Sequence, residues 1–490
     1  MRGKNLFSFS AKGIAICSLG MLCFAACEND KSIQPSGNYP SDIANIVLTK
    51  CATTGCHTTS SKLAAGGLDM STWNHLFEGG NGGSVVIPFR SDQSWLMYFT
   101  NTDSSQGPVL KPTMPYNAPP LSSAELETLK TWIDEGAPNS SGEIPFGNDP
   151  LRKKFYVANQ GCDLVSVFDA DSKLVMRDIS IGNSPAIEAP HEIEVSPDGQ
   201  YWYVVFYAGT TVQKFRTSDD SFVGEIDVGG GGWSTIAISP DGTKAFVVDF
   251  TGGKISYIDL ENLTVIRSYL GFQSPHGIDA SSDFNTLYVT SEYGNVIYKI
   301  DITDPMSPSV NDLCIEPGSS MNFVAGGPDP HQINFSPDGS MYFITCQGQA
   351  QVRAFKTSND SLLAIFPVGS IPQEMSVSEK HPYLFVTCME DECGDKCDGS
   401  VYVINYQTLN IVTSISGGFY QPHDLAVDDE HDVVYVPNRN INPNGPAPHH
   451  SSTCGGRNGF VRIIDISTLQ MLPNYKAEIS VDPYAVAVRR

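Results

Sequence analysis

Basic residues are scarce in this sequence of 490 residues. Thirty Lys and Arg stand against 54 Asp and Glu, which gives a formal net charge of −24. A nucleic-acid-binding protein needs a basic face to neutralise phosphates, so the charge balance argues against that class. No P-loop, dinucleotide fingerprint or nucleophile triad stands out. Only 17% of residues are charged, and 41% are hydrophobic, with 44 Gly and 32 Pro. This composition is typical of a globular, turn-rich protein and not of a disordered one.

The first 26 residues have the pattern of an export signal. A basic start precedes an apolar stretch over residues 13–26, which is too short for a membrane-spanning helix. The stretch ends in Phe-Ala-Ala-Cys, which resembles a bacterial lipobox with Cys27 as the lipidated first residue. The resemblance implies a lipoprotein of the cell envelope, anchored on the periplasmic side or at the outer membrane, with residues 27–39 as a tether. The alternative is an ordinary signal peptide with an unmodified cysteine.

The signal and the lipid site account for three of the 12 cysteines, and nine remain. An exported protein occupies an oxidising compartment, where disulfides are permitted. Cys393 and Cys397 lie in an acidic insert and form a plausible local pair. The pairing of the other cysteines does not follow from the sequence.

A thiol and imidazole motif follows the first expected helix. Ser41 is expected to cap this helix, whose apolar face includes Ile43, Ile46 and Val47. The helix leads into Cys51-Ala-Thr-Thr-Gly-Cys56-His57. Covalent haem attachment uses two thiols and a following His, although here four residues separate the thiols instead of the common two. A Cys51–Cys56 disulfide and a transition-metal site of thiols and imidazole are the alternatives.

The segments that follow decide between these interpretations. Their order is Ala65-Gly-Gly-Leu-Asp69, Val86-Ile-Pro88, Thr113-Met-Pro115 and a closing helix that ends in Trp132-Ile-Asp-Glu-Gly-Ala137. Ser122 and Glu125 form a capping box for this helix, Gly136 stops it, and its apolar face carries Leu126, Leu129, Trp132 and Ile133.

This order of motifs resembles a bacterial cytochrome c domain family that is often fused to larger modules. The resemblance implies a small all-α domain over residues 40–138 with one covalent haem c. Cys51 and Cys56 would hold the haem, with His57 as the proximal and Met114 as the distal iron ligand. Met70 and Met97 are rival distal ligands, which core filling explains better. His75 is expected to be a surface or packing residue.

The remainder of the chain, residues 150–490 after a linker over 139–149, is built from repeats. A turn residue, often Pro, and one variable position precede an alternating strand, as in Pro190-His191-Glu-Ile-Glu-Val-Ser-Pro-Asp-Gly. Seven copies occur, and the variable positions are 43, 42, 55, 42, 50 and 61 residues apart. A base period near 42 with insertions matches a four-stranded propeller blade. The first repeat lacks its inner strand, so the C-terminal strand is expected to complete the first blade and hide both edges.

These repeats resemble the bacterial YVTN β-propeller family, which implies an all-β propeller of seven blades. The fold itself does not specify a function.

Four of the seven variable positions are histidines: His191, His276, His331 and His423. Repeat symmetry places them on one rim near the central channel, where they could hold a metal or a cofactor. Alternatively, they bond a neighbouring blade, or the face binds a partner without metal. The insertions near residues 313–329, 389–399 and 439–458 are expected on the same face, with Cys346, Cys388, Asn438, His449 and His450. His381 and His431 are expected near turns on the far side, without a special role.

Three functions fit these expectations. In the first, the chain is an electron-transfer protein whose propeller docks a redox partner protein or a small-molecule substrate. In the second, it is an oxidoreductase with a metal or cofactor at the propeller hub, fed by the haem. In the third, it is a haem-free binding or scaffold lipoprotein. The sequence leaves open whether the chain is an enzyme.

Overall fold

The computed structural model describes residues 36–316, 327–391, 398–448, 452 and 454–489. The predicted export signal, the predicted lipid site at Cys27, the predicted Cys393–Cys397 pair and both His449 and His450 lie outside these residues. Within the described ranges, no helix is both long and apolar enough to cross a membrane.

Residues 36–138 are helical, and their helices are short. They are α1 (Ser41–Lys50), α2 (Trp73–Leu76), α3 (Trp95–Thr100) and α4 (Ser123–Asp134), with 3-10 turns at Lys62–Ala64, Ser91–Gln93 and Ser104–Gln106. The α1 helix buries Ile43, Ile46 and Val47, as its apolar spacing predicts. The expected cap is wrong, because Pro40 occupies the N-cap and Ser41 is already helical. The ψ of Pro40, 150°, is extended, so the helix begins at Ser41, one residue earlier than expected.

The closing helix agrees with its sequence pattern. The Ser122 hydroxyl accepts from the Glu125 backbone N–H, and the Glu125 carboxylate accepts from the Ser122 backbone N–H, which completes the capping box. Gly136 ends the helix with a φ of 97°, which an L side chain rarely adopts. The Lys50 ammonium lies 2.7 Å from the Glu125 carboxylate and ties α1 to α4. As predicted, α4 buries four residues in the core: Leu126, Leu129, Trp132 and Ile133.

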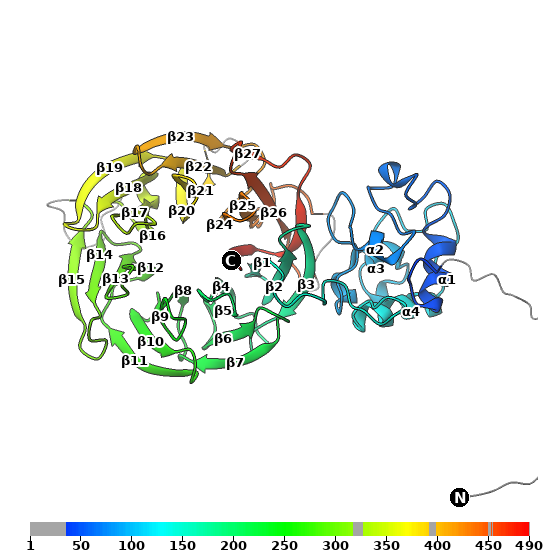
Figure 1. The fold of residues 1–490 in the computed structure, drawn as a ribbon, viewed down its shortest axis with the longest axis horizontal. Coiled ribbons are helices and arrows are strands. Elements are labelled where there is room, and N and C mark those ends of the chain that lie inside the picture. Colours follow the sequence, from blue (N-terminus) through cyan, green and yellow to red (C-terminus); the bar gives the residue numbers. More distant parts are fainter. Residues whose placement is uncertain (1–35, 317–326, 392–397, 449–451, 453, 490) are drawn as a thin grey trace, which may run out of the picture. The chain divides into compact units, whose positions relative to one another are not determined.

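Residues 154–488 form seven antiparallel sheets arranged around a central axis (Figure 1). The predicted seven-bladed propeller is therefore confirmed. Blade 1 contains β29 (Pro483–Val488), β1 (Lys154–Asn159), β2 (Leu164–Asp169) and β3 (Leu174–Ser180). Blade 2 contains β4 (Pro190–Val195), β5 (Tyr201–Phe206), β6 (Thr211–Arg216) and β7 (Phe222–Asp227). Blade 3 contains β8 (Trp233–Ile238), β9 (Lys244–Asp249), β10 (Lys254–Asp259) and β11 (Thr264–Leu270).

The next two blades follow the same strand order. Blade 4 contains β12 (Pro275–Ala280), β13 (Thr286–Ser291), β14 (Val296–Asp301) and β15 (Ser309–Cys314). Blade 5 contains β16 (Pro330–Phe335), β17 (Met341–Cys346), β18 (Gln351–Lys356) and β19 (Ser361–Pro367).

The last two blades carry the larger insertions between their second and third strands. Blade 6 contains β20 (Ser370–Val377), β21 (Tyr383–Glu390), β22 (Ser400–Asn405) and β23 (Asn410–Ile415). Blade 7 contains β24 (Ala426–Asp428), β25 (Val433–Asn438), β26 (Asn458–Asp465) and β27 (Gln470–Met471), with β28 (Ala477–Val481) paired to β26.

The C-terminal strand closes the ring as predicted. Strand β29 pairs antiparallel with β1, and Phe155 lies opposite Val488. The last strand of the chain thereby becomes the innermost strand of the first blade (Figure 1). Because β1 and β29 cover each other, neither is left as an open sheet edge.

Buried threonines join neighbouring blades beside the central channel. The hydroxyls of Thr290, Thr345 and Thr387 donate to the carbonyl groups of His331, Gln373 and His423 in the next blade, at 2.7, 2.8 and 2.6 Å. The same hydroxyls accept backbone N–H groups of their own blade. These threonines share one repeat position near the end of the second strand. Each hydroxyl thus sets the height of the next inner strand.

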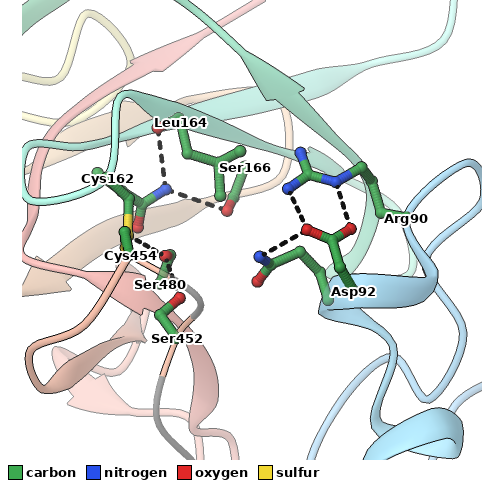
Figure 2. Close-up of a disulfide and its surroundings, with 10 residues drawn as sticks. Arg90, Asp92, Cys162, Leu164, Ser166, Ser452, Cys454 and Ser480 are labelled. Atoms are coloured by element: carbon green, nitrogen blue, oxygen red, sulfur yellow. Dashed lines mark hydrogen bonds and ion pairs between the residues drawn. A yellow bond between two sulfur atoms is a disulfide. The ribbon is translucent and has the colours of Figure 1, made fainter. Parts of the chain in front are cut away.

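A disulfide joins the first and last blades. Cys162 lies between β1 and β2, and Cys454 lies in the insertion before β26, with Cα atoms 5.6 Å apart (Figure 2). The Ser480 hydroxyl donates to the Cys162 sulfur and also bonds the Ser452 hydroxyl at 2.8 Å. The bond links residues 292 positions apart in sequence, so it reinforces the same closure that β29 provides.

Removal of this disulfide is expected to destabilise the propeller. Cys454→Ser should lower the free energy of unfolding by about 3 kcal/mol, because the unfolded chain regains the freedom that the cross-link removes. Urea unfolding of the oxidised protein measures the change. Cys314→Ser, at the exposed end of the outer strand β15, is the matched control and should shift stability by less than about 0.5 kcal/mol. Equal stability of both variants would contradict the assignment.

Candidate functional site

The predicted thiol and imidazole residues share one turn directly after α1. The backbone N–H of Cys56 donates to the Thr53 carbonyl, and that of His57 donates to the Cys51 carbonyl. The four residues between the thiols therefore coil up, and the chain brings His57 back to Cys51. Cys51 is buried and Cys56 is exposed, and neither forms a disulfide. The structure thus does not form the alternative Cys51–Cys56 bond.

Burial sets the protonation states at this turn. It raises the pKa of the Cys51 thiol to about 12. It lowers the pKa of His57, an effect that nearby backbone carbonyl groups partly offset. The imidazole is therefore neutral at physiological pH, which is the form that binds metal ions.

The predicted distal ligand lies on a separate loop. The Met114 backbone N–H donates to the Phe99 carbonyl at 2.7 Å, and the Met114 side chain is half-buried. By contrast, Met70 is 1% exposed and belongs to the helical core, and Met97 packs against that core. Both rivals therefore fill the core, as expected. His75 lies 3.3 Å from the Asp69 carboxylate at the surface.

Apolar side chains are exposed beside both groups of predicted ligands. Leu63, shortly after the thiol turn, is 91% exposed, and Tyr116, two residues after Met114, is 65% exposed. Exposed apolar side chains around polar ligands are common where a cofactor or partner covers them. The residues present, two thiols outside any disulfide, a neutral imidazole and a thioether with apolar neighbours, fit a covalent haem.

The four propeller histidines meet at the hub, as repeat symmetry predicts. Each stands at the start of an inner strand, and each is at most 5% exposed. Ring-centroid distances are 4.1 Å for His276–His331, 5.6 Å for His331–His423, 6.2 Å for His423–His191 and 5.5 Å for His191–His276. The register of strands β4, β12 and β16 shifts at these positions. Such a bulge re-aims a side chain, and here the imidazoles converge.

Two of these histidines bond a neighbouring blade. His191 Nδ1 donates to the Ser234 carbonyl at 2.9 Å, and its Nε2 accepts from the Tyr484 hydroxyl at 3.2 Å. His276 Nδ1 donates to the His331 carbonyl at 3.3 Å. Blade-to-blade bonding therefore accounts for His191 and His276.

The other two histidines are bonded differently. Both ring nitrogens of His423 are buried, and the described residues offer them no hydrogen-bond partner. His331 Nδ1 is buried without an aligned hydrogen bond, although the Gln373 backbone of the next blade interacts with this imidazole. His331 Nδ1 also lies 3.4 Å from Glu374 Oε1. One donor atom from each of His331, Glu374 and His423 falls within 4.8 Å of the other two. This group could hold a metal ion.

Glu374 did not emerge from the sequence, although a signal was present. It directly follows Gln373, which occupies the variable position of its repeat. Acidic residues follow the variable position in three repeats, as Glu192, Glu374 and Asp424. These three carboxylates directly follow the variable positions and were not predicted as site residues.

A cavity of about 620 Å³ runs along the axis beneath the histidines. It extends from the residues that follow the variable positions to the turns between first and second strands, such as Pro197 and Pro337. None of the four hub histidines lines it. Six carboxylate residues line it: Glu192, Glu194, Asp279, Glu374, Glu379 and Asp424.

Burial lowers the pKa values of the hub imidazoles and raises those of the hub carboxyl groups. It lowers the pKa of all four imidazoles, to about 4 for His276, and neighbouring imidazoles add to the effect for the others. Burial raises the pKa of Asp424 to about 7 and that of Glu374 well above the ordinary range. The hub is therefore a cluster of neutral imidazoles above weakly acidic carboxyl groups.

Two further histidines of the described propeller contact carboxylates. His381 Nε2 lies 2.9 Å from Asp432, and His431 Nδ1 lies 2.7 Å from Asp428. Among the described residues, Cys346, Cys388 and Asn438 are buried at or near the ends of second strands.

Comparison with known proteins identifies the fold and little more. No family model matches the chain. Antigen Lp49 of Leptospira interrogans (serogroup Icterohaemorrhagiae, serovar copenhageni) is 23% identical over 226 residues, which cover 42% of this chain and 46% of the relative. The chain thus spans less than half the length of that curated relative.

The solved structures that resemble the chain are also distant. A functionally unknown protein from Desulfotomaculum acetoxidans is 17% identical, with a TM-score of 0.52 over 68% of this chain and 98% of the other. It shares the fold. Hydrazine synthase from Kuenenia stuttgartiensis is 17% identical, with a TM-score of 0.48 over 63% and 92%. The dihydro-heme d1 dehydrogenase NirN in complex with DHE is 14% identical, with a TM-score of 0.47 over 84% and 95%.

One hub carboxyl group should leave a measurable pH signature. Glu292 Oε1 accepts from the Gln347 amide at 3.1 Å, and its Oε2 lies 3.9 Å from His276 Nε2. Burial raises its pKa from 4.5 to about 7. The folded state therefore retains a proton that the unfolded state releases between these pH values.

Wild type should lose stability relative to Glu292→Gln as pH rises from 4.5 through 7. The loss should reach about 3 kcal/mol above pH 8, since each pKa unit corresponds to about 1.4 kcal/mol. Urea unfolding at pH 5 and pH 8 measures the difference. Glu127→Gln, at an exposed position on α4, is the control and should behave alike at both pH values. A difference between wild type and Glu292→Gln that does not change with pH would refute the shift.

Proposed function

We propose that the chain is an exported, lipid-anchored c-type cytochrome in which the helical domain carries one haem and the propeller binds the electron-exchange partner. The observation that carries this proposal is the single turn that presents Cys51, Cys56 and His57 together, with neither thiol in a disulfide. Haem with His/Met ligation supplies reversible one-electron transfer at a raised potential.

Each residue of the turn would contact the haem in a different way. Cys51, fixed at the end of α1, and Cys56, exposed at the turn, would attach it through their thiols. His57, neutral because it is buried, would be one iron ligand. Met114, on a loop held by the Phe99 carbonyl, would be the second.

The propeller face that carries the insertions is the proposed docking surface. The insertion before β16 connects a fourth strand to a first strand, and those before β22 and β26 connect second to third strands. The described strand ends that flank all three insertions lie on the same face as the starts of the inner strands, and large loops gathered on one face of a rigid scaffold commonly bind partners. The net charge of −24 favours a redox protein with a basic face, or a cationic substrate.

The proposed location is the cell envelope, with Cys27 as the lipid site. The Cys162–Cys454 disulfide supports this location, because disulfides persist in oxidising compartments. The location does not depend on the propeller's ligand.

Covalent attachment should depend on the two thiols of the turn. Mature protein from a host with cytochrome c maturation should keep its haem on a denaturing gel, whereas the double variant Cys51→Ser/Cys56→Ser should lose the stain entirely. Cys314→Ser is the control and should stain like wild type. A wild-type protein without covalent haem would eliminate the cytochrome proposal and leave a lipid-anchored binding protein.

The distal ligand should be identifiable by potentiometry. Met114→Ala should lower the midpoint potential and alter the absorption spectrum, because loss of the thioether removes the ligand that raises the potential. Met97→Leu, which changes a packing residue of similar volume, should leave the potential unchanged. The opposite pattern would assign the distal position to Met97.

A further inference from the structure

We propose that His331, Glu374 and His423 form a binding site for a divalent transition-metal ion at the inner end of the propeller channel. This site goes beyond electron transfer by the helical domain, and it does not depend on haem attachment. Two imidazoles and one carboxylate are the donor set of open zinc and non-haem iron centres.

His423 differs from the other hub histidines in its hydrogen bonding. His191 and His276 use their Nδ1 atoms to bond the neighbouring blade, and His331 interacts with the Gln373 backbone. His423 is 2% exposed, yet neither of its ring nitrogens has a hydrogen-bond partner among the described residues. A buried polar group without a partner is destabilising. A bound cation would satisfy one ring nitrogen of His423.

The donor atoms lie close to the spacing that a metal ion requires. A tetrahedral zinc ion with bonds of about 2.0–2.2 Å needs donor atoms roughly 3.5 Å apart. His331 Nδ1 and Glu374 Oε1 are 3.4 Å apart, and the full set lies within 4.8 Å. Small side-chain rotations therefore suffice to close the set around an ion.

Neighbouring groups hold the donor residues in place. The Gln332 amide donates to Glu374 Oε2, which leaves Oε1 directed to His331. The Thr387 hydroxyl donates to the His423 carbonyl and accepts the Glu374 backbone N–H at 3.1 Å. One side chain of β21 thus fixes the backbone of two donors. Such outer partners are typical of metal centres.

The axial cavity gives a cation a route to the site. Glu374 belongs both to the donor set and to the lining of the axial cavity, which also carries Glu192 and Asp424. On the other side, the Tyr484 ring stacks on His423 with centroids 3.6 Å apart, and the Arg439 guanidinium lies 4.7 Å from the Tyr484 centroid. A cation would therefore enter from the carboxylate-lined channel, and its open coordination position would face that channel.

Zinc binding tests the site with variants matched in position and chemistry. The chelator-stripped mature holoprotein is titrated with Zn²⁺, with zinc per chain measured by mass spectrometry and affinity measured by chelator competition. His423→Gln and Glu374→Gln should weaken the tightest zinc site by at least about 100-fold. His191→Gln is the control and should bind within about threefold of wild type. Gln already occupies this repeat position as Gln373, so the fold accommodates it. Equal affinity in all four proteins would overturn the proposal.

X-ray absorption at the zinc edge of the wild-type protein provides a second test that needs no variant. The expected result is a zinc ion bound to two imidazole nitrogens and to oxygen. A shell without imidazole would refute the site. A sulfur shell would place zinc on cysteine thiols and would refute the assignment to His331, Glu374 and His423. A haem-free protein with two imidazoles around zinc would refute only the proposed electron transfer.

Discussion

The inner strands of the propeller depend on one interaction, repeated at several blade junctions, in which a buried group of one blade bonds the carbonyl that begins the next inner strand. Thr290, Thr345 and Thr387 supply this donor for three successive blades, and His191 supplies it for the Ser234 carbonyl. Because these carbonyls belong to the variable positions, the same bonds fix where the variable side chains emerge. The hub is thus a consequence of blade packing, and its spacing of about 4–6 Å between imidazole rings follows from that packing.

The hub histidines differ in how they join this interaction. In blade 4 the Thr290 hydroxyl and His276 Nδ1 both bond the His331 carbonyl. Blade 2 has Val205 at the threonine position, and His191 alone bonds the next blade. His423 is held through its own carbonyl by Thr387, while both of its ring nitrogens are unpaired among the described residues at 2% exposure.

Repetition explains how far the sequence predicts the structure. Seven copies of one strand pattern specified the blades, the closing strand β29 and the convergence of the four histidines. The capping box at Ser122 was readable because its signal is local. The Cys162–Cys454 bond was not readable, because it spans 292 residues, and nor was the role of Glu374, which only the distance to His331 reveals. Local patterns specify elements, whereas contacts between distant loops depend on the completed ring.

We propose two separate centres in this chain, one at the turn that carries Cys51, Cys56 and His57 and one at the propeller hub. Anomalous diffraction from crystals of the mature holoprotein grown with Zn²⁺, recorded at the iron and zinc edges, tests both centres together. An iron peak between His57 and Met114 and a zinc peak among His331, Glu374 and His423 is the predicted result. A hub without a zinc peak, or no iron peak beside His57, would contradict it.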